Sequence, residues 1–97
     1  MGKRGLCVRE LWVDSRQITD EQGEMRIFDY AILIGERDTG PFFCESYGVK
    51  IAERGSGNLS MIPDVTTRIG RIDELMELLI RNEVLPGHLL DVVMDWL

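Results

Sequence analysis

The chain is poor in the residues that build metal sites and disulfide frameworks. Its 97 residues include one histidine and two cysteines, Cys7 and Cys44, with no further Cys or His at ligand spacing around them. A structural zinc site needs about four such ligands, and two isolated cysteines make no disulfide framework. We therefore expect no metal, no cofactor and free thiols in a reducing compartment, with Cys44 buried in apolar surroundings.

Long apolar runs are also missing. No stretch approaches the roughly 20 residues of a membrane-spanning helix. The basic start, residues 1–5, is not followed by the apolar segment that a signal peptide requires. The sequence therefore predicts a soluble, cytoplasmic protein without a membrane partner.

Positive charge is scarce. Eleven Lys and Arg residues stand against seventeen Asp and Glu residues, which gives a formal net charge of −6. The phosphate backbone repels a chain this acidic, so the charge argues against nucleic-acid binding. The one basic cluster, Lys3, Arg4 and Arg9, is thin.

What remains is the composition of an ordinary globular domain. Hydrophobic residues make up 44% and charged residues 29% of the chain. This length fits one domain and leaves no room for two. We expect a single domain over residues 1–97, with residues 1–5 flexible.

Four segments carry the alternation and the β-branched and aromatic residues of strands. They are residues 6–14, 25–34, 42–53 and 59–66. Apolar residues on both parities make 25–34 the best candidate for a central strand. Residues 14–24 and 35–41 have the polar and glycine content of connections.

Two residues within these strands carry positional information. Gly48 in mid-strand predicts a bulge or a close approach by a neighbouring backbone. Pro63 cannot donate to a ladder, so its strand is expected at a sheet edge, or to end there.

The last third of the chain has helical spacing. Two apolar stripes recur at three- and four-residue intervals: Ile69, Ile72, Leu75, Met76 and Leu79, then Leu89, Val92, Val93 and Trp96. Thr66 and Thr67 offer an N-cap. Asn82 is expected to end the first helix in the left-handed conformation, and Pro86 to begin the second.

Strands grouped before helices predict an α+β fold. We expect a four-stranded antiparallel β-meander followed by two C-terminal helices packed on one sheet face. The opposite face then keeps apolar residues from the first three strands, and exposed apolar surface usually marks a partner surface.

Candidate chemical groups are few. His88 and Asp91 form His-x-x-Asp on one helical side, which suits half of a metal site or an ordinary surface histidine. Cys44 has no recognisable base partner. The carboxylates of the helices fit a cation cluster or, more simply, solvated faces. The aromatic residues fit a groove or plain core packing: Trp12, Phe42, Phe43 and Trp96.

The ending resembles that of a known group of proteins. Residues 81–97 read RNEVLPGHLLDVVMDWL, and a Tyr47-Gly48-Val49 strand precedes them. This pattern is similar to a family of short uncharacterised proteins from Gram-positive bacteria. The resemblance covers most of the chain and implies no activity. It does imply that His88 is part of a shared pattern.

Together these observations favour a non-enzymatic interaction or regulatory module with a protein partner. The expected partner is a second copy, bound through the open sheet face or an edge. The alternative is a small-molecule or metal-binding sensor with a site near His88. If there is a site, the candidate residues are Asn82, Glu83, His88 and Asp91. No catalytic residue is expected.

Overall fold

The computed structural model describes residues 9–38 and 43–97. The expected flexibility of residues 1–5, together with Cys7, Phe42 and the side chain of Phe43, lies outside this part. Four strands come first: β1 (Arg9–Thr19), β2 (Met25–Asp38), β3 (Phe43–Glu53) and β4 (Leu59–Thr66). Helix α1 (Ile69–Arg81), the 3-10 turn η1 (Pro86–His88) and helix α2 (Leu89–Trp96) follow.

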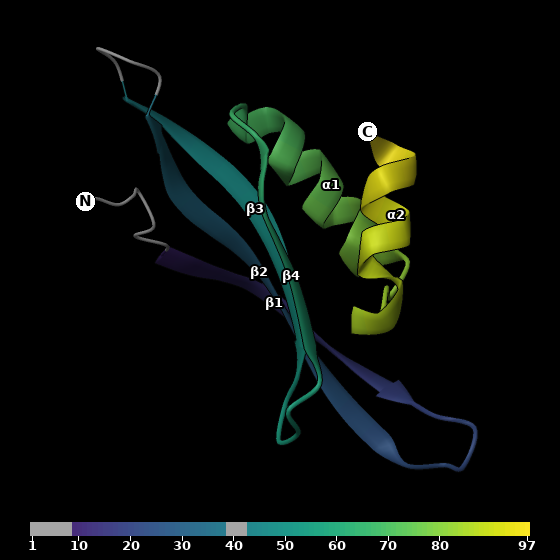
Figure 1. The fold of residues 1–97 in the computed structure, drawn as a ribbon. Coiled ribbons are helices and arrows are strands. Elements are labelled where there is room, and N and C mark those ends of the chain that lie inside the picture. Colours follow the sequence, from purple (N-terminus) through teal and green to yellow (C-terminus); the bar gives the residue numbers. More distant parts are fainter. Residues whose placement is uncertain (1–8, 39–42) are drawn as a thin grey trace.

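The sheet is an antiparallel meander with the strand order β1-β2-β3-β4. Both helices lie on the same side of it (Figure 1), and α1 contacts β2, β3 and β4. The predicted α+β fold, with its meander and two helices on one face, is confirmed.

The core fills the space between this sheet face and the helices. Apolar side chains of the two central strands meet the inner stripes of α1 and α2. The side chains that are fully buried there are Tyr30, Val49, Ile51, Ile72, Leu75, Met76, Leu79, Leu89 and Val93. The helical spacing found in the sequence therefore marks the inner faces of both helices, except at Ile69, which begins α1 and is 61% exposed.

The first hairpin is longer than predicted. β1 continues to Thr19 and β2 begins at Met25, which reduces the expected connection to residues 20–24. In that turn, the Asp20 carboxylate accepts hydrogen bonds from the backbone N–H groups of Gln22 and Glu24, both at 2.9 Å. Polar residues do not prevent strand formation here because β1 is an edge strand and leaves most of its side chains in water.

The second hairpin also differs from its prediction. β2 runs on through Gly35 to Asp38, where the glycine and charge content predicted a turn. Pairing with β3 explains the extension, since Gly35 lies opposite Ser46 and Glu36 opposite Glu45. A single glycine weakens a strand but does not end it when the partner strand continues.

The pairing of β3 with β4 confirms both positional predictions. The register shifts between Tyr47 and Val49, so β4 bulges past Gly48. A side chain at Gly48 would collide with the Ile62 carbonyl oxygen and with the Cα of Pro63. Pro63 itself lies in β4, which is the other edge strand of the sheet.

The ends of α1 differ from expectation in detail. The N-cap is Arg68, not Thr66 or Thr67, and its side chain makes no capping hydrogen bond. The Thr66 hydroxyl accepts a hydrogen bond from the Arg68 N–H at 3.1 Å, before the helix begins. Asn82 does end the helix, but with a negative φ. The left-handed residue is Glu83, at φ 50°.

A Schellman motif explains why Glu83 takes this conformation. The Glu83 N–H donates to the Ile80 carbonyl and the Val84 N–H to the Leu79 carbonyl, which satisfies two carbonyls at the helix end. The reversal turns Val84 back into the core, where its carbonyl accepts from the Tyr30 hydroxyl at 2.9 Å. Pro86 then begins η1, and α2 begins at Leu89.

Candidate functional site

Strand β1 is a free edge of the described sheet, since β2 is the only strand that pairs with it. Three consecutive apolar residues lie exposed on this edge strand: Leu11, Trp12 and Val13. Trp12 is 61% exposed, so its interpretation as core filling is wrong. The physical reason is its place on an edge strand, with its side chain on the sheet face that the helices do not cover.

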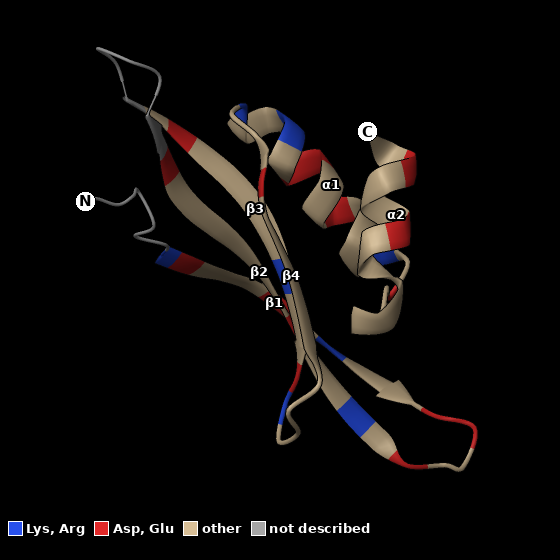
Figure 2. Ribbon diagram, viewed as in Figure 1, with Lys and Arg blue, Asp and Glu red and all other residues tan. Residues whose placement is uncertain are grey.

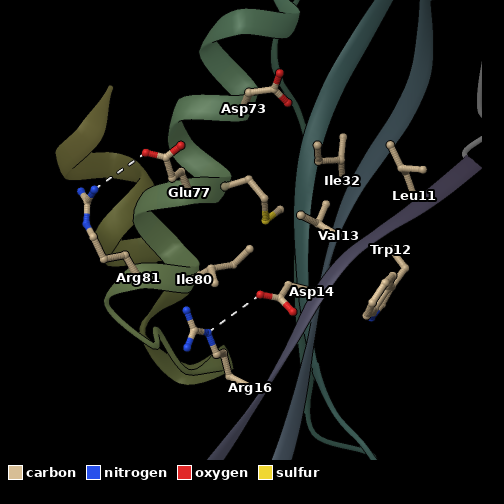
Figure 3. Close-up of a pocket in the computed structure, with 11 residues that line it drawn as sticks. Leu11, Trp12, Val13, Asp14, Arg16, Ile32, Asp73, Glu77, Ile80 and Arg81 are labelled. Carbon is tan, nitrogen blue, oxygen red and sulfur yellow. Dashed lines mark ion pairs between the residues drawn. The ribbon is translucent and has the colours of Figure 1, made fainter.

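A β-bulge sets the direction of these side chains. The register passes from Trp12 opposite Ala31 to Asp14 opposite Tyr30, which leaves Val13 without a partner in β2. The extra residue changes the parity of the strand. Leu11, Val13 and Asp14 consequently face the side on which the helices lie, whereas Trp12 faces away (Figure 3).

On the helix side, α1 does not reach across to β1, and a groove of about 760 Å³ separates them. Figure 3 shows its walls. Its apolar lining comes from both walls and the floor: Leu11, Val13, Ile32, Met76 and Ile80. An apolar groove beside an exposed strand edge is a surface that a further chain segment can fill.

Charged residues border this groove. Arg16 lies 4.0 Å from Asp14 along β1, and Arg81 lies 3.9 Å from Glu77 on α1 (Figure 3). Both pairs are exposed and therefore contribute little to stability. Their alternating signs matter more for the orientation of whatever binds there.

The opposite edge is built differently. β4 contains Pro63, a bulge opposite Gly48, and Asp64 at a positive φ of 58°. Proline and bulges are the usual means by which a sheet edge is kept from pairing with another chain. β1 has a bulge but no proline, so it is the better template of the two.

A comparison with family models bears on the chain as a whole. One model matches residues 9–97 and so spans every described strand and helix. The chain belongs to DUF6514, a family of unknown function. The resemblance to an uncharacterised family is thus confirmed. No curated protein and no solved structure matches the chain. Within the described residues of this DUF6514 chain, no helix is long and apolar enough to cross a membrane.

The structure spreads the four residues that the sequence singled out around the junction of the two helices. Asn82 and Asp91 line a common hollow of about 610 Å³ between α1 and α2. Glu83 and His88 are exposed but do not line it. Among the described residues, no side-chain hydrogen bond or ion pair joins any two of the four. The structure therefore brings together two of the four candidate residues, Asn82 and Asp91.

The described residues also bear on the metal and thiol predictions. No three His, Cys, Asp or Glu residues within 9–38 and 43–97 converge as metal ligands. Cys44 is exposed, so the prediction of a buried thiol is wrong. Its apolar sequence neighbours suggested a core position, but Cys44 lies at the beginning of β3, opposite Arg37.

The open sheet face of the DUF6514 chain carries a polar network that the sequence did not indicate. The Ser15 hydroxyl donates to Asp29 at 2.5 Å and accepts from the Trp12 indole at 3.0 Å. Arg54 donates to Asp29 at 2.6 Å. This guanidinium, and then the Ser15 hydroxyl, hold the pKa of Asp29 below its ordinary value.

Beside this network, Lys50 reaches across the sheet to Glu10 at 3.0 Å. Cross-strand pairing of residues far apart in sequence creates both groups, so no local pattern reveals them. The face expected to be apolar is therefore mainly polar where β1, β2 and β3 run side by side. In the described strands, the exposed large apolar side chains are Leu11, Trp12 and Val13 on β1, Met25 at the start of β2, and Leu59 and Met61 on β4.

Proposed function

We propose that this DUF6514 chain is a non-enzymatic interaction module that self-associates through β1. The observation that supports the proposal is an eleven-residue edge strand with exposed Leu11, Trp12 and Val13 beside an apolar groove. Unpaired backbone groups along such an edge are satisfied when another strand adds to it. A regulatory or adaptor role follows from controlled pairing at this edge.

A second copy is the partner that best fits the charges of β1. If two β1 strands pair antiparallel about Ser15, each Asp14 lies opposite the partner's Arg16. Opposite charges placed directly across two strands are favourable, and the two-fold symmetry produces the pair twice. Such an isologous contact is closed, so it yields a dimer rather than a fibre.

This pairing also uses the apolar residues. The two sheets join into one, and along the paired strands Val13 of each copy lies opposite Gln17 of its partner and Leu11 opposite Thr19. The partner's β1 then borders each groove and covers part of its apolar lining. Burial of these side chains supplies the stabilising free energy, at about 25 cal/mol per Å² of apolar surface.

Size-exclusion chromatography with light scattering at micromolar concentration tests the proposal. The unmodified chain is expected to elute as a dimer. Leu11→Lys combined with Val13→Lys places charges against the partner's β1 and is expected to give a monomer. Leu59→Lys is the matched control, because Leu59 is 48% exposed on β4 and Leu11 is 53% exposed on β1.

The control variant is expected to remain dimeric. A monomeric unmodified chain contradicts self-association, and a dimer that survives the double variant contradicts the role of β1. The alternative of a sensor near His88 has no comparable support, since within the described residues His88 has no converging polar partners.

A further inference from the structure

Helix α2 has apolar side chains that do not pack in the core. Leu89 and Val93 face the core, but Leu90, Met94 and Leu97 are 58%, 64% and 67% exposed. Their spacing of four and three residues places them in one row along the helix. We name these three residues the outer row. A helix that is apolar on a second face ordinarily packs on a second partner.

A row of negative charge runs next to the outer row. Asp91 and Asp95 each follow an outer-row residue in sequence, and both are exposed. Figure 2 shows acidic positions of α2 in red. Neither carboxylate has an ion pair or side-chain hydrogen bond with another described residue. Two unpaired carboxylates flanking an apolar row define the charge of the partner that fits there.

The hollow between α1 and α2 lies beyond these carboxylates. Leu78, Val92 and Trp96 give it an apolar lining, and Asp91 and Asp95 line it as well. The Arg71 guanidinium already lies over the Trp96 ring, with 4.0 Å between its central carbon and the ring centroid. One side of the Trp96 ring thus already holds a cation of this chain, so a partner's basic side chain is expected to lay its stem along the apolar lining and its head beside the carboxylates.

We propose that α2 is a docking surface for an amphipathic helix with basic flanks from another protein. The apolar face of that helix covers the outer row, and its Lys or Arg residues pair with Asp91 and Asp95. A second copy of α2 fits poorly, because antiparallel packing brings four carboxylates together. An anionic membrane surface fits poorly for the same reason.

This surface is separate from the β1 edge. α2 contacts β4 at the opposite side of the sheet, so docking at α2 and pairing at β1 can succeed or fail independently. The oligomeric state reports on one and peptide binding reports on the other.

A labelled helical peptide of about fifteen leucine and lysine residues is a suitable probe, since shorter helices are marginal in water. Fluorescence anisotropy with the full chain is expected to give a micromolar dissociation constant that weakens with added salt. The corresponding peptide of leucine and glutamate is expected to bind at least about tenfold more weakly.

Variants of exposed residues then distinguish specific binding at α2 from nonspecific attraction to the negative charge of the whole chain. Leu90→Gln combined with Met94→Gln, and Asp91→Asn combined with Asp95→Asn, are each expected to weaken binding about tenfold. Glu21→Gln combined with Glu24→Gln is the matched control. It removes two exposed charges from the turn between β1 and β2 and is expected to change binding less than about twofold.

Circular dichroism confirms that each variant is folded. The proposal is overturned if the control weakens binding as much as the Asp91 and Asp95 variant does, since bulk charge then explains the affinity. It is also overturned if the outer-row variant binds normally, if no peptide binds, or if anionic lipid vesicles bind through the outer row instead.

Discussion

At the scale of single residues, Tyr30 links the sheet to the helical layer. Its ring is fully buried in the core, and its hydroxyl donates to the carbonyl of Val84, which follows the turn at the end of α1. A buried carbonyl needs such a donor, because leaving it unpaired costs about 1–3 kcal/mol. One hydroxyl thereby holds the helix junction, and the candidate residues around it, against β2.

This tyrosine makes stability depend on pH at the alkaline end. Burial, and next the Glu83 carboxylate, raise the pKa of Tyr30 from 10.0 to about 12. Below pH 10 both states hold the proton and stability is unaffected. Between pH 10 and 12 the unfolded chain releases the proton first, so the free energy of unfolding falls by about 1.4 kcal/mol per pH unit. Urea unfolding at a series of pH values measures this slope.

Tyr30→Phe is the comparison for that slope, though the variant also lacks the hydrogen bond to Val84. At pH 8 it is expected to be less stable by roughly 0.5–1.5 kcal/mol. It is also expected to lose less stability from pH 10 to 12 than the unmodified chain. Equal slopes in the two proteins contradict the assignment of the alkaline decline to Tyr30.

At the scale of elements, Gly48 governs how β4 crosses β3. A Cβ at this position meets the backbone of Ile62 and Pro63 rather than a movable side chain. Gly48→Ala is therefore expected to destabilise the fold by roughly 1–3 kcal/mol, the usual cost of overpacking. Thermal unfolding followed by circular dichroism measures the change.

Gly57→Ala is the control for Gly48→Ala. A Cβ at Gly57 meets no atom within 4 Å, so this variant is expected to stay within about 0.5 kcal/mol of the unmodified chain. If both variants unfold at the same temperature, the strand crossing tolerates a side chain and the close approach is not a constraint.

The elements also show what the sequence can predict. Four strands, two helices and the positions of Gly48 and Pro63 follow from periodicity and backbone chemistry, which act within a few residues. The full length of β1 does not follow, because pairing with β2 holds polar residues in a strand. The left-handed residue is Glu83 instead of Asn82 because the hydrogen bonds of the helix end select the position.

The candidate surfaces were harder to predict for a related reason. Leucine, tryptophan and cysteine are commonly core residues, so residue type alone favours burial of Leu11, Trp12 and Cys44. Whether the helices cover them depends on how far α1 and α2 extend over the sheet. The network of Ser15, Asp29 and Arg54 joins three separate segments. Only the register between strands brings such groups together.

At the scale of the whole molecule, the two apolar surfaces lie at opposite sides of one sheet. The outer row and its carboxylates lie beside β4, and the exposed apolar residues of β1 lie at the other edge. A dimer formed through β1 therefore leaves both copies of α2 accessible. The two docking surfaces then point outward from a joined sheet, so one dimer can hold two basic partners.

The geometry of that dimer can be tested by cross-linking. In an antiparallel pair centred on Ser15, this residue faces its own copy, with Cα atoms about 4.5–5.5 Å apart, a distance that a disulfide spans. Two copies of Gln17 are four positions apart along the strands, about 13 Å.

In a chain that also carries Cys7→Ser and Cys44→Ser, Ser15→Cys is therefore expected to form a covalent dimer on mild oxidation. Gln17→Cys is expected to remain monomeric on a non-reducing gel. Equal cross-linking at both positions, or none at Ser15→Cys in a chain that is dimeric by light scattering, contradicts this pairing of β1. A yield of cross-linked dimer that is highest for Ser15→Cys instead establishes that Asp14 of each copy lies opposite Arg16 of the other. This register leaves the two residues no other partners on the adjoining strand.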